Sequence, residues 1–298
     1  ILMIVAGLFI SSCGKYELFE REHYKNVFAL LSYESDNIFT EEHDLTDSQT
    51  EGYISAVCGG SLPTEKDIDI TIVEDTDILS RYNMRFTKED EYVQLVPRNQ
   101  YEIASYSIKI SAGERTGKTK ITMRANGLSP DSVYVIPLKV TKFSSYEVNP
   151  DKSYIMYRVL LKNYYAKMNA SKTGTTYSLR GKHDNVNVMS TKVLYPVAGD
   201  KVRINAGNLT YTASSAISIN RTAIVLQIDE SNKVHISAWK DIEVEQIDDD
   251  PDYPNIFMIE DTGYKKYKTF LLRYDYIYDG VRHSMQEELR YDLENDKQ

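Results

Sequence analysis

The sequence is poor in cysteine, with two such residues among 298, Cys13 and Cys58. A small scaffold held together by disulfides needs a far higher share of cysteine, so that class is excluded. Glycine and proline, at 14 and 8 residues, are too few for a collagen-like or low-complexity chain. A hydrophobic content of 42% excludes disorder. The chain is therefore globular, and at about twice the ~150 residues of a typical domain it is predicted to form two domains.

Positive charge is also scarce. Lysine and arginine together number 35 against 44 aspartate and glutamate residues, which leaves a net charge of −9. A protein that binds a phosphate backbone or an anionic membrane surface needs a clustered basic footprint. We therefore expect no nucleic-acid partner.

Recognisable catalytic and metal-binding patterns are missing. The five histidines show no zinc-ligand spacing and are His23, His43, His183, His235 and His283. The acidic run at 248–252 lacks the spaced ligands and central glycine of a calcium loop, so it is interpreted as a solvated turn. No nucleophile-elbow pattern is present either. The sequence predicts no metal, no cofactor and no enzymatic activity.

Tyrosine, by contrast, is abundant, at 24 residues against 8 phenylalanines and 1 tryptophan. Tyrosine favours strands and contact surfaces, so the composition points to β structure. From about Lys25 the hydrophobic period is two, as in Ile68, Ile70 and Ile72. Strands every 8 to 12 residues predict an immunoglobulin-like β-sandwich over 25–162. One short helix is expected over 76–82, and Pro137 predicts an edge strand or a bulge.

The second half, 163–298, has longer strands that are richer in tyrosine. Its predicted strands are 187–195, 201–213, 223–229, 234–239, 243–247, 256–259, 267–278 and 281–292. The last two are joined by Asp279-Gly280, a dipeptide typical of two-residue hairpin turns. Long antiparallel arms of this kind favour a closed barrel, which removes exposed strand edges.

The N-terminal segment 1–12 is uncharged and almost wholly apolar, but it is too short to cross a bilayer. We interpret it as the hydrophobic part of a signal peptide without its basic start. Its end, Ile10-Ser11-Ser12-Cys13, resembles a bacterial lipobox, which predicts a lipidated Cys13 and a polar tether over 13–24. An ordinary secretory signal followed by an incidental cysteine is the alternative.

Sugar binding needs exposed rings and hydrogen-bonding side chains. Trp239 is the first candidate, because His235 and Trp239 share the face of their strand opposite Val234 and Ile236. The alternative places Trp239 as a plug in a barrel end or in the seam between the domains. A second platform is predicted from tyrosines near loops or strand ends, namely Tyr164, Tyr165, Tyr253, Tyr264 and Tyr267.

Several segments resemble one family across nearly the whole chain beyond the signal segment. In the first half they are Tyr82-Asn83, Leu95-Val96-Pro97, 110–113 and 134–140, and in the second they are 268–270, 273–276 and 288–291. These segments, with the lipobox, are similar to two-domain surface lipoproteins of the Bacteroidetes. The resemblance implies an immunoglobulin-like domain followed by a calycin-like (lipocalin-like) barrel, and a place in a polysaccharide or glycoprotein utilisation system. It implies no catalytic residues.

Together these features predict a non-catalytic outer-membrane lipoprotein, on the cell surface or the periplasmic face, that binds a glycan. A structural subunit that docks to an outer-membrane transporter or to an enzyme such as a glycosidase is the first alternative. A barrel that carries a small apolar ligand is the second.

Overall fold

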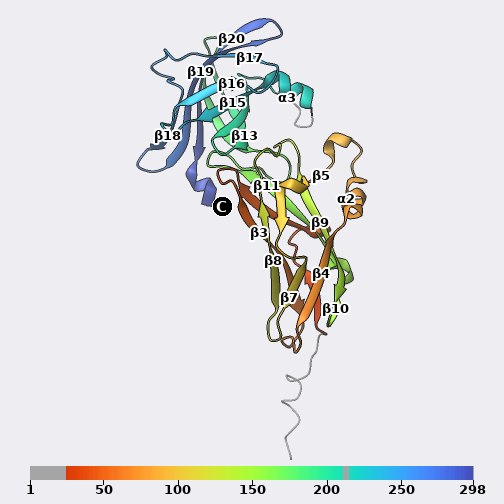
Figure 1. Ribbon diagram of the computed structural model, residues 1–298. Coiled ribbons are helices and arrows are strands. Elements are labelled where there is room, and N and C mark those ends of the chain that lie inside the picture. The colour runs from red at the N-terminus through yellow and green to blue at the C-terminus, as the bar shows by residue number, and fades with distance from the viewer. Residues whose placement is uncertain (1–24, 211–214, 298) are drawn as a thin grey trace, which may run out of the picture.

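The computed structural model describes residues 25–210 and 215–297 as two β-rich domains set end to end (Figure 1). The predicted signal peptide, Cys13 and the whole tether over 13–24 lie outside the described residues. The prediction of an all-β chain, with an immunoglobulin-like sandwich followed by a calycin-like barrel, is confirmed.

The first domain is a sandwich of two sheets. Its first sheet contains, in spatial order, β10 (Glu147–Val148), β1 (Val27–Leu30), β3 (Thr50–Gly59), β8 (Thr116–Met123) and β6 (Tyr101–Ile103). Its second sheet contains β2 (Ile38–Asp44), β11 (Tyr154–Lys162), β9 (Tyr134–Phe143), β4 (Ile68–Glu74) and β7 (Ser107–Ile110), with β5 (Gln94–Leu95) beside β9. Most pairs are antiparallel, but β1 with β10, β2 with β11 and β5 with β9 are parallel.

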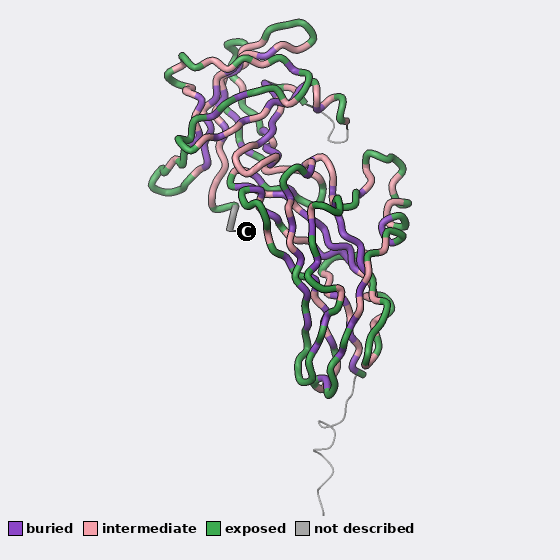
Figure 2. Tube along the Cα trace, in the orientation of Figure 1, coloured by how far each residue is buried: buried purple, intermediate pink, exposed green. Residues whose placement is uncertain are grey.

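The expected alternation places the sandwich core. Ile68, Ile70 and Ile72 on β4 are fully buried, as are Ile108 and Ile110 on β7. Figure 2 shows buried residues along the middle of the sandwich strands and exposed ones in the loops. The period of two therefore distinguishes core from surface in this domain.

A buried histidine belongs to the same core. His43 on β2 has no exposed surface, and its ring nitrogens lie 2.6 Å from Thr50 Oγ1 and 3.0 Å from the Tyr157 hydroxyl. Burial, with a smaller contribution from the charge of Lys162, lowers the pKa of His43 from 6.5 to about 4. The imidazole is therefore neutral in the folded protein near pH 7.

The short helix α2 (Thr76–Asn83) confirms the predicted one. Asp75 caps it by accepting a hydrogen bond from the Asp77 amide at 3.1 Å. Ile78 and Leu79 of α2 pack on the outer side of the second sheet with a small separate cluster that includes Val135. Single 3₁₀ turns complete the chain at Ser35–Asn37, Glu89–Glu91, Arg98–Gln100, Pro150–Lys152 and Leu293–Lys297.

Pro137 corrects one expectation, because β9 is an interior strand between β11 and β4. The pairing of β9 with β4 begins at Leu138 and its pairing with β5 ends at Val135. On the side of β9 that faces β4 and β5, Pro137 thus lies between the ends of these two pairings. Its carbonyl accepts there from the Asp75 amide at 3.0 Å. No ladder bond needs the amide hydrogen that proline lacks.

The second domain is a nearly closed barrel. Its strands, in spatial order, are β16 (Val234–Ala238), β15 (Ala223–Ile228), β14 (Lys201–Asn205), β13 (Val186–Ala198), β12 (Thr175–His183), β20 (Val281–Asp292), β19 (Lys266–Tyr278) and β17 (Glu243–Gln246), with β18 (Ile256–Asp261) beside β19. The two edges meet where the Ile236 amide donates to Gln246 Oε1 at 2.6 Å and the Val234 amide donates to the Asn255 carbonyl at 2.7 Å. These bonds satisfy edge groups that would otherwise be open.

The predicted hairpin of β19 and β20 is present, and positive φ angles of 51° and 77° at Asp279 and Gly280 suit its two-residue turn. The predicted strand over 201–213 is too long, since β14 ends at Asn205 and Gly207 turns the chain with φ 49°. Residues 211–213 lie outside the described part.

Helix α3 (Ala216–Thr222) was not expected from the sequence. Its residues include two isoleucines, a serine, an asparagine and a threonine, which all have modest helix propensity. The Ser215 side chain caps the helix by accepting from the Ser218 amide at 3.3 Å. A local cap thus outweighs a weak propensity.

The domains meet through apolar packing and one tight turn. Met168 and Tyr195 of the second half pack into the core of the sandwich. At the β13–β14 turn a Cβ on Gly199 would lie 2.7 Å from Thr46 Cα, so only glycine allows this approach. The Asn163 side chain donates to the carbonyls of Ala198 and Lys201 in the same turn, at 2.7 and 2.9 Å.

A partly buried ion pair also crosses the seam. Arg203 on β14 has no exposed surface and donates to both carboxylate oxygens of Asp131, in the sandwich loop before β9, at 2.7 and 2.5 Å. Its guanidinium carbon lies 5.0 Å from the ring centres of both Tyr195 and Trp239. This bidentate geometry holds the barrel at a defined place on the sandwich.

The ion pair predicts strong coupling between its two side chains. Asp131→Ala leaves a buried guanidinium without its carboxylate and is expected to lower the free energy of unfolding by about 3 kcal/mol. The double variant Asp131→Ala/Arg203→Met should cost clearly less than the two single changes together. Urea denaturation followed by the fluorescence of Trp239, the one tryptophan of the chain, measures this at the seam. Additive costs would contradict the prediction.

His43 predicts a loss of stability in mild acid. The unfolded chain binds a proton at this imidazole near pH 6.5, but the folded chain does so only near pH 4. The free energy of unfolding should therefore fall by about 3 kcal/mol between these values as the pH drops. Urea titrations followed by circular dichroism should show a flatter pH dependence for His43→Asn. The same change at exposed His235 is the control, and an unaltered slope in His43→Asn would refute the assignment.

Candidate functional site

Two of the predicted tyrosines, Tyr164 and Tyr165, line a cavity of about 290 Å³ where the barrel meets the sandwich. Glu42, Asp44 and Lys162 contribute from the sandwich. The barrel contributes Thr175, Lys268, Tyr291 and Leu293, and the segment between the domains contributes Asn163, Ala166 and Lys167. The cavity is therefore built by both domains at one end of the barrel.

Asn163 positions the two rings at this joint. β11 ends at Lys162, and the next side chain, Asn163, accepts from the amides of Tyr165 and Ala166 at 3.0 and 2.9 Å. The Tyr164 and Tyr165 rings then meet edge to face, with centres 5.4 Å apart. Tyr164 is 51% exposed, whereas Tyr165 packs against Phe257 with ring centres 4.9 Å apart. The rings thus form one supported and accessible aromatic corner.

Polar groups surround the aromatic corner. Lys268 lies with its ammonium 4.7 Å from the centre of the Tyr164 ring, and Lys162 forms an ion pair with Glu42 at 3.1 Å. Burial, with smaller contributions from Tyr164 and Asp200, raises the pKa of the Tyr165 hydroxyl, which stays protonated at neutral pH. The cavity therefore offers aromatic faces for C–H groups beside donors and acceptors for hydroxyl groups.

Sequence reasoning missed Glu42, Asp44 and Lys268 as members of this site. The sequence pattern could have indicated Lys268, because this residue lies on the inward-facing row of β19 with Phe270 and Tyr274. A lysine on a core-facing row is unusual and points to a special environment. Glu42 and Asp44 carry no comparable local signal, since only the domain arrangement brings them here.

Trp239 and His235 occupy other positions. His235 is exposed on the outer face of β16 and lies 3.0 Å from Asp229, while Val234 and Ile236 face the barrel core as expected. Trp239 is half-buried against Arg203 at the seam between the domains. Neither residue lines the Tyr164 cavity. Their role in ligand binding stays a prediction.

The remaining predicted tyrosines are dispersed. Tyr264 is 96% exposed at the tip of the β18–β19 turn. Tyr267 faces away from the cavity and has the Arg290 guanidinium 4.1 Å above its ring. Tyr253 belongs to the acidic loop before β18, where its amide donates to Asp250 at 3.2 Å. The structure thus brings together two of the five predicted tyrosines.

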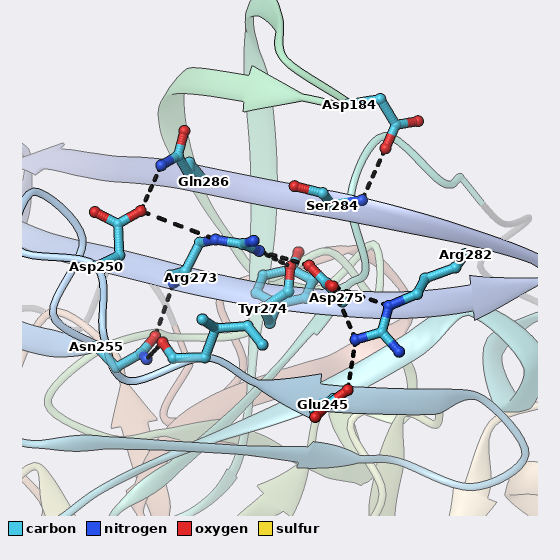
Figure 3. A network of polar contacts seen from close by, with 11 residues as sticks. Asp184, Glu245, Asp250, Asn255, Arg273, Tyr274, Asp275, Arg282, Ser284 and Gln286 are labelled. Atoms are coloured by element: carbon cyan, nitrogen blue, oxygen red, sulfur yellow. Dashed lines mark hydrogen bonds and ion pairs between the residues drawn. The ribbon is translucent and has the colours of Figure 1, made fainter.

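The outer face of β19 and β20 carries a network of charged and polar side chains (Figure 3). Arg273 donates to Asp275 at 2.6 Å, and Arg282 joins Asp275 to Glu245 of β17 at 3.0 and 2.5 Å. Asp250 of the acidic run accepts from Gln286. Asp248, Asp249 and Asp252 of the acidic run are exposed, as expected of a solvated turn.

The barrel interior is filled by side chains. Eight inward hydrophobic residues of three strands are at most 2% exposed, namely Tyr177, Leu179, Phe270, Leu272, Tyr274, Tyr276, Met285 and Leu289. Lys192 and Glu287 form an ion pair among them, and the Tyr274 hydroxyl donates to Glu287 at 2.9 Å. This packed and partly ionic middle disfavours a small apolar ligand among these side chains, but a cavity of about 560 Å³ opens beside β13 and the segment after β14, lined by Leu179, Lys192 and Asn205 among others, so the alternative of a barrel that carries a small apolar ligand stays a prediction.

Among the described residues, no helix has both the length and the apolar character to cross a bilayer.

Two family models match the chain in sequence order. A model described as an N-terminal domain matches residues 21–147, and a model described as a C-terminal domain matches residues 153–290. No curated protein matches the chain.

Several solved structures share the whole two-domain fold. A Bacteroides ovatus protein of unknown function is 16% identical, with a TM-score of 0.66 over 90% of this chain and 95% of its own. A B. ovatus multidomain protein including DUF1735 is 14% identical, with a TM-score of 0.63 over 89% and 94%. An auxiliary nutrient binding protein from B. thetaiotaomicron is 16% identical, with a TM-score of 0.57 over 88% and 94%. At these identities the likeness concerns the fold.

Proposed function

The chain belongs to the Bacteroidetes family of two-domain proteins built from this N-terminal and this C-terminal domain, and from that premise we propose that it is a non-catalytic, lipid-anchored surface protein that binds a glycan. One relative of the same fold carries the name of an auxiliary nutrient binding protein, which supports a binding role. We further propose that it serves a polysaccharide or glycoprotein utilisation system, with an outer-membrane transporter or a glycosidase as a partner.

The Tyr164 cavity is the observation that carries the binding proposal. Sugar rings present apolar C–H faces between hydroxyl groups, so a binding site needs an accessible aromatic face flanked by polar side chains. Tyr164 supplies the face, and Glu42, Asp44 and Lys162 supply the hydrogen-bonding groups around it. A cavity of about 290 Å³ accommodates one or two sugar units rather than a long buried chain.

Loss of the exposed ring is the sharpest test of this site. Tyr164→Ala should weaken glycan binding about tenfold, which corresponds to roughly 1.4 kcal/mol. Retention of the full chain on affinity gels that contain host or plant glycans, after a glycan array has identified a ligand, measures the effect.

Tyr264→Ala is the matched control, because it removes an even more exposed tyrosine that lies outside the cavity. Equal losses in both variants, or no retention of the wild type on any glycan, would overturn the proposal. A partner protein that co-purifies in the absence of sugar affinity would instead favour a structural subunit.

The proposed anchor has its own test. Cys13→Ser should remove the lipid and shift the protein from the membrane fraction to the soluble fraction, because each buried CH₂ of an acyl chain contributes ~0.8 kcal/mol. Fractionation of the natural host and mass spectrometry of the mature N-terminus would measure both changes. Cys58→Ser is the control, since Cys58 is buried in the sandwich. An unlipidated wild type would refute the anchor.

A further inference from the structure

Two histidines and an aspartate come together at the end of the barrel opposite the Tyr164 cavity. His183 ends β12, Asp184 follows it in the turn, and His283 lies on β20. One ligating atom from each of the three residues can be chosen so that all lie within 4.8 Å of one another. Along β19, which borders both places, Lys268 and Tyr276 are roughly 26 Å apart at 3.3 Å per residue. The cluster is therefore separate from the Tyr164 cavity.

The strand ladders hold the backbone of all three residues. His183 pairs with Met285 across β12 and β20, and His283 pairs with Tyr276 across β20 and β19. The Asp184 amide donates to the Ser284 carbonyl at 2.9 Å, and the Ser284 amide donates back to Asp184 Oδ1 at 2.8 Å. Figure 3 shows this last contact beside β20. The donor set is thus fixed by sheet hydrogen bonds rather than by a free loop.

The side chains converge on one carboxylate oxygen. Asp184 Oδ2 lies 2.8 Å from His283 Nδ1 and 3.8 Å from His183 Nε2. The imidazole rings stack with centres 5.2 Å apart, and the Tyr276 hydroxyl lies 2.9 Å from His183 Nε2. Metal ligands at about 2.1 Å from a shared ion are themselves ~3.4 Å apart. The 2.8 and 3.8 Å separations of Asp184 Oδ2 from the two imidazole nitrogens bracket this spacing, and the stacked rings would have to turn for both nitrogens to face one ion.

The geometry points to a binding site for a divalent first-row transition ion of the zinc class, with His183, Asp184 and His283 as ligands and the Tyr276 hydroxyl beside them. Two imidazole nitrogens favour zinc, nickel, cobalt or copper over calcium and magnesium, which prefer oxygen ligands. The side chains of His183, Asp184 and His283 are 22%, 44% and 24% exposed. An ion can thus enter from solvent and keep a coordination position open to water.

A direct test uses the full chain, freed of any affinity tag and stripped with a chelator. Isothermal titration with Zn²⁺ should show one bound ion per chain, and Co²⁺ should give visible absorption bands of a site with nitrogen and oxygen ligands. Zn²⁺ should also raise the thermal midpoint, because a ligand of the native state stabilises it. His183→Ala and His283→Ala should each weaken Zn²⁺ binding at least tenfold.

His235→Ala is the matched control, because it removes a histidine that also contacts an aspartate, Asp229, but that joins no second imidazole in such a cluster within 25–210 and 215–297. Its Zn²⁺ affinity should equal that of the wild type. Asp184→Asn keeps an oxygen for the Ser284 amide and tests the carboxylate without disturbing the turn. Absence of Zn²⁺ binding, or an equal loss in His235→Ala and His283→Ala, would overturn the proposal.

Discussion

The buried amide of Asn163 fixes the point where the two domains join, and the candidate site depends on it. Its nitrogen donates to two carbonyls of the β13–β14 turn, and its oxygen accepts from two amides of the following residues. One side chain thus binds the barrel to the last sandwich strand and shapes the turn that carries Tyr164 and Tyr165. Arg203 and Asp131 add a second attachment at the seam. The Asn163 side chain thus holds the backbone that carries the aromatic corner.

The barrel has a packed middle, and its polar candidate sites lie at its two ends. Its middle is filled by tyrosine, phenylalanine and leucine side chains around the ion pair of Lys192 and Glu287. Polar groups lie at its two ends, with the exposed Tyr164 and the buried Lys268 near the sandwich and the His183 cluster at the other end. The architecture therefore suits binding at the rims.

Most strands of both domains could be predicted, because in a half-buried strand buried and exposed residues alternate with a period of two. Ile68, Ile70 and Ile72 show this in the sandwich, and the Asp279-Gly280 dipeptide marks the turn of the final hairpin. The errors arise where local context overrides the pattern. Gly207 ends a strand through a positive φ, and Pro137 sits in an interior strand because its neighbours leave a gap there.

By itself the sequence determined the all-β class, the order of a sandwich and a barrel, and Tyr164 and Tyr165 as candidates, since alternation, turn dipeptides and composition are local properties. Only the tertiary structure decided which residues share a site. Strand pairing sets His183 beside His283, a hundred positions away, and the domain seam sets Glu42 beside Lys268. Such partners depend on long-range strand register and on domain packing, which cannot be read from the sequence of either partner's own segment.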